Sequence, residues 1–101
     1  MLTGKQRSYL KGLANGLSPI VYIGKQGLTD SVAASVEQAL DDHELVKVKI
    51  QDDTFLKPKE VCNELADRFG AEFVQAIGKK FVLYRPAREA EKRKIQLPKG
   101  R

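Results

Sequence analysis

The spacing of apolar residues switches repeatedly along the chain between the repeat of a helix and the repeat of a strand. Residues 46–50, Val-Lys-Val-Lys-Ile, alternate strictly, which is typical of a strand with one buried and one solvated face. The segments before and after this strand place apolar residues three or four positions apart, as in a buried helical stripe. These stripes are Val32, Val36 and Leu40, and then Val61, Leu65 and Phe69. Such a chain is expected to pack helices against a sheet.

Capping and turn residues divide the rest of the chain. Thr3 and Gln6 have the spacing of a capping box, Thr29 is a good N-cap, and Pro58 suits the first turn of a helix. The expected elements are a helix between Thr3 and Gly16, a strand over 20–23, a helix after Thr29, a strand over 46–50, a helix from Pro58 to Gly70, and strands over 72–77 and 81–85. Strand–helix–strand units require parallel pairing, and the closing hairpin adds an antiparallel strand. We therefore expect an α/β fold, a compact single domain with a mixed four-stranded sheet packed by helices.

The length of 101 residues suits one domain with a short appendage. We assign residues 1–85 to the domain and residues 86–101 to a basic C-terminal tail, partly helical or disordered, because the composition becomes highly charged after Pro86. No stretch approaches the ~20 apolar residues that cross a bilayer, and the N-terminus lacks the apolar run of a secretory signal. Cys62 is the one cysteine, which leaves no disulfide or cysteine-based metal site. We expect a cytoplasmic protein without a membrane partner.

The net charge of +5 is distributed unevenly along the chain. Residues 1–29 carry four basic side chains and no acidic one, and residues 79–101 carry nine basic and two acidic ones. The middle, residues 30–78, carries five basic and eleven acidic side chains. Basic segments of this kind attract polyanions, although solvated surface charge would give the same pattern.

Few residues are suited to catalysis or metal binding. His43 lies at a predicted helix end, where it is expected to cap carbonyl groups, and Cys62 lies beside a buried helical stripe as a small hydrophobic residue. Five carboxylates flank the strand at 46–50 and are expected to form a solvated acidic rim: Asp41, Asp42, Glu44, Asp52 and Asp53. Because no phosphate-binding fingerprint or catalytic constellation is visible, we expect no enzymatic activity, no metal and no cofactor.

The loop Gly24-Lys25-Gln26-Gly27 is the best candidate for a binding site. Two glycines let the backbone turn tightly and approach a ligand closely, and Lys25 adds a positive charge. The loop leads into a predicted helix N-terminus, which favours anions. An ordinary turn explains the spacing equally well, and Asp30 would oppose a phosphate placed close to it.

Four stretches carry a resemblance to a known family. They are Leu2-Thr3-Gly4-Lys5-Gln6-Arg7, Pro19-Ile20-Val21-Tyr22-Ile23-Gly24-Lys25-Gln26-Gly27-Leu28-Thr29, His43-Glu44-Leu45-Val46-Lys47-Val48-Lys49, and Gly78 with Leu83-Tyr84-Arg85. They span residues 2–85, in order. The chain resembles the CRM domain, named for chloroplast RNA splicing and ribosome maturation, in its single-domain bacterial YhbY-like form.

The resemblance implies a fold similar to the C-terminal domain of bacterial translation initiation factor three. It also implies RNA binding through the G-x-x-G loop. In bacteria the family is associated with precursors of the large ribosomal subunit, and in plants its multi-domain relatives assist group II intron splicing. The tail after Arg85 lies outside the family pattern.

The predicted RNA-binding residues centre on the loop. Gly24 and Gly27 allow close approach of the backbone, Lys25 neutralises a phosphate, and Gln26 hydrogen-bonds phosphate, sugar or base. Further candidates are Arg7 and Lys11, provided that the first helix packs near the loop, and then Lys80 and Arg85, with Lys79 and Arg88 as weaker ones. Tyr22 could stack on a base, but a core position at the strand end is favoured. We therefore expect recognition of structured RNA through its backbone and shape.

The expected partner is RNA, and specifically ribosomal RNA in precursors of the large ribosomal subunit. Under this hypothesis the protein is a monomer that assists ribosome assembly, with ribosomal proteins as further candidate partners. The alternative hypothesis is a protein-interaction module that docks on a ribosomal protein through its sheet or acidic middle. Such a module would make only non-specific RNA contacts.

Overall fold

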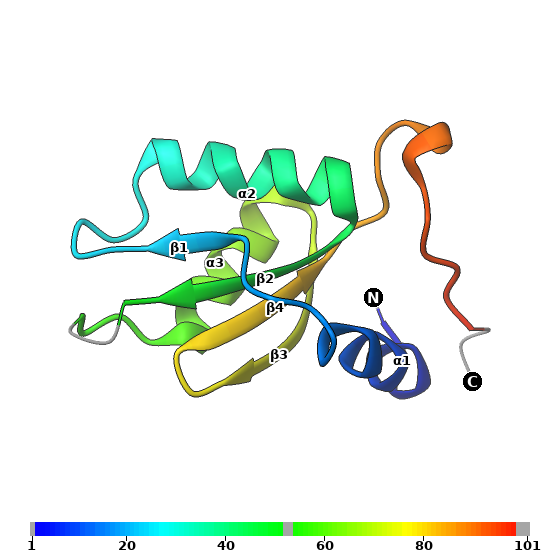
Figure 1. The fold of residues 1–101 in the computed structure, drawn as a ribbon, viewed down its shortest axis with the longest axis horizontal. Coiled ribbons are helices and arrows are strands. Elements are labelled where there is room, and N and C mark those ends of the chain that lie inside the picture. Colours follow the sequence, from blue (N-terminus) through cyan, green and yellow to red (C-terminus); the bar gives the residue numbers. More distant parts are fainter. Residues whose placement is uncertain (1, 52–53, 99–101) are drawn as a thin grey trace.

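Three α-helices and four strands follow one another in the predicted order in the computed structural model, which describes residues 2–51 and 54–98 (Figure 1). The elements are α1 (Gly4–Ala14), β1 (Val21–Ile23), α2 (Asp30–His43), β2 (Leu45–Ile50), α3 (Pro58–Phe69), β3 (Glu72–Ile77), β4 (Lys80–Tyr84) and a 3₁₀ turn, η1 (Ala90–Lys92). Every strand begins within one residue of its predicted start. The predicted α/β class and element order are therefore confirmed.

The four strands form one mixed sheet in the order β1-β2-β4-β3. β1 and β2 are parallel, as their strand–helix–strand connection requires, whereas β4 is antiparallel to both β2 and β3. The closing hairpin thus inserts its second strand between β2 and β3. This strand order, which the apolar pattern leaves open, places Lys49 of β2 between Tyr22 of β1 and Lys80 of β4.

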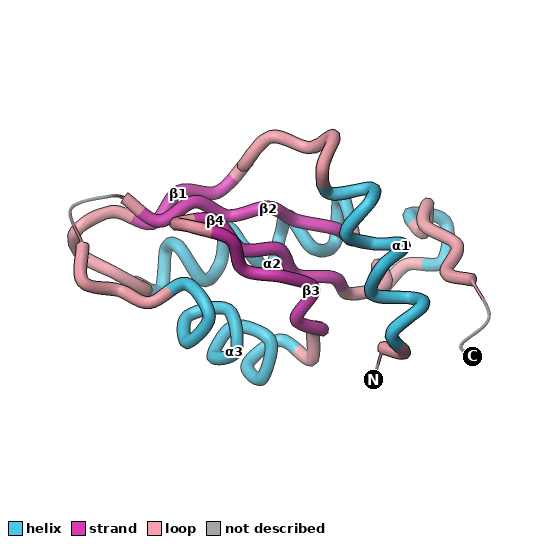
Figure 2. The backbone as a smooth tube through the Cα atoms, turned by 90° about the horizontal axis from the view of Figure 1, so that it is seen from below, coloured by secondary structure: helices cyan, strands magenta, loops and turns pink. Residues whose placement is uncertain are grey.

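The two faces of the sheet are covered differently. α2 and α3 bury the main core against one face, and Figure 2 shows α3 running along the sheet. The inward residues of the two central strands are Val46, Val48, Ile50, Phe81 and Leu83. On the other face, Leu10 and Ala14 of α1 pack against Leu45, Val82 and Tyr84. Because Leu45 begins β2 and Tyr84 ends β4, α1 covers one end of this face.

Local signals fix the helix ends. Thr3 and Gln6 form the predicted capping box, since the Gln6 N–H donates to Thr3 Oγ1 at 3.1 Å and the Thr3 N–H donates to Gln6 Oε1 at 3.1 Å. Thr29 caps α2, with its Oγ1 accepting from the Val32 N–H at 3.2 Å. Gly70 ends α3 in the left-handed conformation. The helices therefore begin and end where their sequences predict.

Glu44 corrects the prediction of a wholly solvated acidic rim. Its side chain is buried, with only 1% of the residue exposed, and it follows α2 with a positive φ of 64°. The carboxylate accepts hydrogen bonds from the backbone N–H groups of Ala87 at 3.0 Å, Ile95 at 2.9 Å and Lys94. Burial alone would raise the pKa of Glu44, but these three hydrogen bonds and nearby Arg93 lower it below the ordinary value.

The described part of the C-terminal tail packs on the domain through these bonds. Ala87 is buried, and Ile95 and Leu97 pack against the smaller core beside α1. Gln6 Nε2 donates to the Pro98 carbonyl at 3.0 Å, which joins α1 to the end of the described tail. Across residues 2–51 and 54–98, no helix is long and apolar enough to span a bilayer.

Candidate nucleic-acid interface

The loop Gly24-Lys25-Gln26-Gly27 forms a β-turn at one tip of the molecule, between β1 and α2 (Figure 1). The Gly27 N–H donates to the Gly24 carbonyl at 3.0 Å, and Lys25 and Gln26 occupy the two exposed central positions. Gly27 has a φ of +74°, a conformation that is strained for any residue with a Cβ atom. The turn therefore requires its second glycine and presents the Lys25 and Gln26 side chains to solvent.

The first glycine of the turn lies against Gln51. A Cβ atom added to Gly24 would be 3.3 Å from Gln51 Oε1, so the side chain of Gln51 flanks the loop. The backbone holds this arrangement, because the Gln51 N–H donates to the Ile23 carbonyl at 2.8 Å. Gln51 is not among the residues predicted from the sequence, because its position beside the loop depends on the pairing of β1 with β2.

Asp30, whose negative charge would oppose a phosphate bound near the N-terminus of α2, forms an ion pair there. Arg68 Nη2 of α3 lies 3.7 Å from Asp30 Oδ1. The pair is exposed and therefore weak, but it places a cation beside the only acidic residue in the first turn of α2. Arg68 also lies over the ring of Phe69, with its Cζ 5.6 Å from the ring centroid. Asp30 thus opposes an anion less than its charge alone suggests.

Lysines gather on the part of the sheet face that α1 leaves open. Lys47 and Lys49 project from β2 on this face, and Lys80 of β4 pairs directly with Lys49. Together with Lys79 they line a hollow of about 430 Å³. From the sequence, Lys47 and Lys49 are expected on an ordinary solvated face, because their alternation with valines does not reveal which strand lies beside them.

Tyr22 corrects the prediction that it belongs to the core. Its neighbours Val21 and Ile23 are buried, but Tyr22 points to the opposite face of the sheet and is 64% exposed. It is the cross-strand neighbour of Lys49. Tyr22, Lys49, Gln51 and Gly24 line a hollow of about 340 Å³, which connects the lysine-bearing face to the loop.

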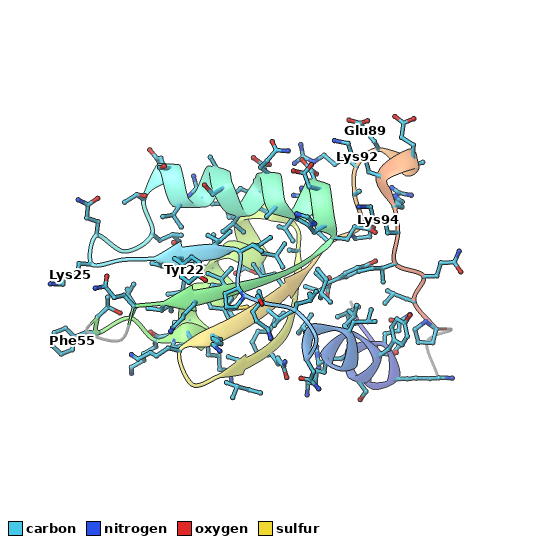
Figure 3. The ribbon with its side chains drawn as sticks, viewed as in Figure 1. Tyr22, Lys25, Phe55, Glu89, Lys92 and Lys94 are labelled. Atoms are coloured by element: carbon cyan, nitrogen blue, oxygen red, sulfur yellow. The ribbon has the colours of Figure 1, made fainter. Side chains whose placement is uncertain are left out.

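A second exposed aromatic side chain, Phe55, lies beside Lys25 of the loop. It is fully exposed and shares a shallow hollow with Lys25 and Leu56. Figure 3 shows the side chains of Phe55 and Lys25 at the same tip of the molecule. Phe55 is not among the residues predicted from the sequence, although a lone aromatic residue in a polar connection without apolar periodicity is a signal for it.

Comparison with known proteins identifies the family. The model of the CRS1/YhbY (CRM) domain matches residues 2–85. The chain belongs to the CRS1/YhbY (CRM) domain family. A Haemophilus influenzae protein named as an RNA-binding protein is 45% identical over 98 residues, covering 97% of this chain and 96% of that protein.

Two further relatives support the assignment. Bacillus subtilis YqeI, described as a candidate RNA-binding protein, is 35% identical over 98 residues and covers 97% of this chain and 100% of its own length. A solution structure of a Staphylococcus aureus protein, also described as a candidate RNA-binding protein, superposes with a TM-score of 0.79 at 38% identity. That match covers 97% of this chain and 100% of the other. The family predicted by resemblance is thus confirmed, as is the fold.

In this CRM domain, α1 does not extend the surface around the loop. α1 packs where β2 begins, whereas the loop lies where β1 and β2 end, so the two are at opposite ends of the sheet (Figures 1 and 2). Arg7 is half-buried, and its Nε donates to the Phe73 carbonyl at 3.3 Å. Lys11 is exposed but lies on the same helix. Arg7 and Lys11 are predicted to extend the RNA-binding surface only if the first helix packs near the loop. The structure places this helix at the other end of the sheet, so that condition is not met.

Arg85 is a second correction to the predicted surface of the CRM domain. It is only 7% exposed, because its guanidinium is enclosed in the structure. Arg85 Nη2 donates to Asp41 Oδ1 at 2.6 Å, and Nη1 donates to the Phe69 carbonyl at 3.0 Å. Arg85 therefore holds α2 and α3 to the end of β4 and is not accessible to RNA.

The weaker basic candidates have partners of their own. Arg88 forms an exposed ion pair with Glu37 at 3.0 Å, and Lys79 Nζ donates to the Thr54 carbonyl at 3.4 Å. Of the predicted basic residues outside the loop, Lys79 and Lys80 line the hollow on the face that carries Lys47 and Lys49.

Among the residues considered from the sequence for catalysis or metal binding, Cys62 and Asp42 have structural contacts. Cys62 is buried, and its thiol lies 3.7 Å from the Val82 carbonyl. Burial raises the pKa of this thiol to about 12. The buried position confirms the interpretation of Cys62 as a small hydrophobic residue. His43 is the exposed last residue of α2. Asp42 accepts from Gln38, while Asp52 and Asp53 lie outside the described residues. Within 2–51 and 54–98, no cluster of His, Cys, Asp and Glu is arranged to hold a metal ion.

Proposed function

We propose that this CRM domain is a non-catalytic RNA-binding protein that contacts the RNA backbone through the Gly24–Gly27 loop and the lysine-bearing face of the sheet. The observation that carries the proposal is the position of the loop. It presents Lys25 on an exposed turn next to a helix N-terminus and is joined to Lys49 by the hollow that Tyr22 lines. Glycine-framed backbone, a helix N-terminus and lysines together suit phosphate groups. The named activities of the relatives support the same conclusion.

The RNA we propose is ribosomal RNA in precursors of the large ribosomal subunit. The CRM family resemblance supports this choice, and the surface suits a partner with many closely spaced phosphates. Crosslinking the protein to RNA in cells tests it. We expect the crosslinks to concentrate on large-subunit ribosomal RNA and its unprocessed precursors. Crosslinks spread over messenger RNA and transfer RNA would contradict the choice.

The backbone contact itself is tested by salt titration. With a labelled fragment of large-subunit ribosomal RNA, log affinity should fall linearly with log salt, by about 0.7 to 0.9 for each neutralised phosphate. Lys25→Ala and Lys49→Ala should weaken binding to many sequences alike and reduce the slope by about one each. Lys5→Ala is the matched control, since Lys5 is an exposed lysine in the first turn of α1.

The same titration separates the proposal from the alternative hypothesis. A protein-interaction module that docks on a ribosomal protein would bind RNA weakly and would respond to Lys5→Ala as much as to Lys25→Ala. Equal responses of these two variants would therefore exclude the loop as the site of RNA contact.

A further inference from the structure

Two exposed aromatic side chains flank the loop without contributing to the core. Phe55 is fully exposed, and Tyr22 is 64% exposed on the face of the sheet that faces away from α2 and α3. Burial of a large apolar side chain stabilises a fold, and these two exposed side chains contribute little of that stabilisation. Among the described residues neither side chain packs in either of the two cores.

The two aromatic residues lie among lysines along one path. On the sheet, Lys80, Lys49 and Tyr22 are consecutive cross-strand neighbours on β4, β2 and β1. Adjacent strands are about 4.8 Å apart, so these three side chains lie in a row of about 10 Å. The hollow lined by Tyr22 leads to Gly24, and Lys25 on the turn shares the next hollow with Phe55. The path thus runs from Lys80 to Phe55 across the tip of the molecule.

Lysines and exposed rings along one path suit single-stranded RNA better than a duplex. Lysines neutralise the phosphates, and aromatic faces stack on bases that are not already paired and stacked. In an RNA duplex the bases stack on each other and leave no face for Tyr22 or Phe55. This surface therefore favours single-stranded RNA, whereas the sequence predicts recognition of structured RNA through its backbone and shape.

We propose that Tyr22 and Phe55 are stacking platforms for unpaired bases beside the Gly24–Gly27 loop, and that the site binds single-stranded nucleotides. This inference rests on the proposed RNA-binding function and deepens it. The loop and the lysines hold the backbone, while the two rings select segments whose bases are free. The two hollows, of about 340 and 450 Å³, place the Tyr22 ring beside Gly24 and the Phe55 ring beside Lys25.

The test compares an unstructured RNA of about 12 nucleotides with a duplex of the same length. The wild-type protein should bind the single strand more tightly. Tyr22→Ala and Phe55→Ala should each weaken single-strand binding by about 5- to 100-fold and leave duplex binding and the salt slope unchanged. Tyr22→Phe and Phe55→Tyr should retain the affinity, because they keep the ring. A 2-aminopurine base in the single strand should change its fluorescence on binding wild type but not the alanine variants.

Tyr9→Ala is the matched control, because Tyr9 is 43% exposed on α1, at the other end of the sheet. It should bind both RNAs as wild type does. If Lys25→Ala weakens binding while Tyr22→Ala and Phe55→Ala do not, stacking is excluded and the RNA-binding function stands. If none of the three variants changes the binding of either RNA, both proposals fail.

Discussion

Lys49 and Lys80 lie directly opposite each other on the antiparallel strands β2 and β4. Like charges in this position destabilise a sheet, and among the described residues neither ammonium group has a hydrogen-bond or ion-pair partner. Tyr22 flanks Lys49 on one side, and Ile77 flanks Lys80 on the other. The free protein therefore carries a local repulsion that a bound anion would relieve.

Replacement of Lys80 should change stability and RNA binding in opposite directions. Lys80→Glu converts the repulsion into a cross-strand ion pair with Lys49 and should stabilise the free protein by about 0.2–1 kcal/mol. The same change places a negative charge on the proposed RNA path and should weaken RNA binding. Urea denaturation at low salt measures the first effect, and filter binding measures the second.

Lys80→Gln and added salt serve as controls for this prediction. Lys80→Gln removes the repulsion without adding a negative charge, so its gain in stability should be smaller. The gain of both variants should shrink at 1 M salt, where the screening length is about 3 Å. A Lys80→Glu variant that is both less stable and unimpaired in RNA binding would contradict the assignment of this face.

The sequence was sufficient to predict the elements and the loop, because their signals are local. The Thr3 capping box, the Thr29 N-cap and the glycine at 70 act within one helical turn, and the structure contains all three. The two glycines at 24 and 27 specify their turn in the same way. Signals of this kind do not depend on which strand lies beside which.

The predictions that the structure corrects concern residues whose neighbours come from distant parts of the chain. Arg85 is buried because Asp41, 44 positions earlier, pairs with it, and Glu44 is buried because residues 43 to 51 positions later donate to it. The prediction of a core position for Tyr22 is wrong because β1, with three residues, is too short for its sequence to show which side chains face the core. The distance between α1 and the loop depends on strand order, which apolar spacing does not encode.

Glu44→Gln should destabilise the protein at neutral pH. Glu44 Oε1 accepts from Lys94 and Ile95, and Oε2 accepts from Ala87. An amide in place of the carboxylate would direct an NH₂ group against at least one of these N–H donors. The expected loss is about 1–3 kcal/mol in urea denaturation, because a buried group then lacks its partner.

The pH dependence follows from the direction of the Glu44 pKa shift. Its pKa in the folded protein is lower than the ordinary value of 4.5, so the ionised carboxylate stabilises the fold fully above about pH 4.5. This contribution is lost as the pH falls through the folded-state pKa. The difference between wild type and Glu44→Gln should therefore be constant near neutrality and shrink in acid. Glu37→Gln, which breaks the exposed pair with Arg88, should cost less than about 1 kcal/mol.

Arg85→Ala should unfold the protein more readily without altering its RNA contacts. Removing Arg85 leaves Asp41 without its 2.6 Å partner and the Phe69 carbonyl without a donor. The Asp41 side chain is 26% exposed, so the loss of stability should be smaller than the loss of about 3–5 kcal/mol for breaking a fully buried ion pair from one side. At a temperature where the variant remains folded, its RNA affinity and salt slope should equal those of wild type. A reduced salt slope of RNA affinity in fully folded Arg85→Ala would show that Arg85 contacts RNA.

Alanine substitutions at the two loop glycines should separate folding from binding. Gly27→Ala forces a Cβ atom into a backbone with φ of +74° and should cost about 1 kcal/mol or more of stability. Gly24 does not have a positive φ, and its added Cβ would meet only the movable end of the Gln51 side chain at 3.3 Å. Gly24→Ala should therefore fold nearly as well as wild type.

The binding measurement gives the decisive comparison between these two glycines. The Cβ atom of Gly24→Ala would stand in the hollow that joins Tyr22 to the loop, so RNA affinity should fall although the thermal midpoint hardly moves. Gly12→Ala is the matched control, because a Cβ atom there meets nothing within 4 Å and α1 lies far from the loop. Wild-type affinity in folded Gly24→Ala would show that RNA does not approach the backbone at this turn.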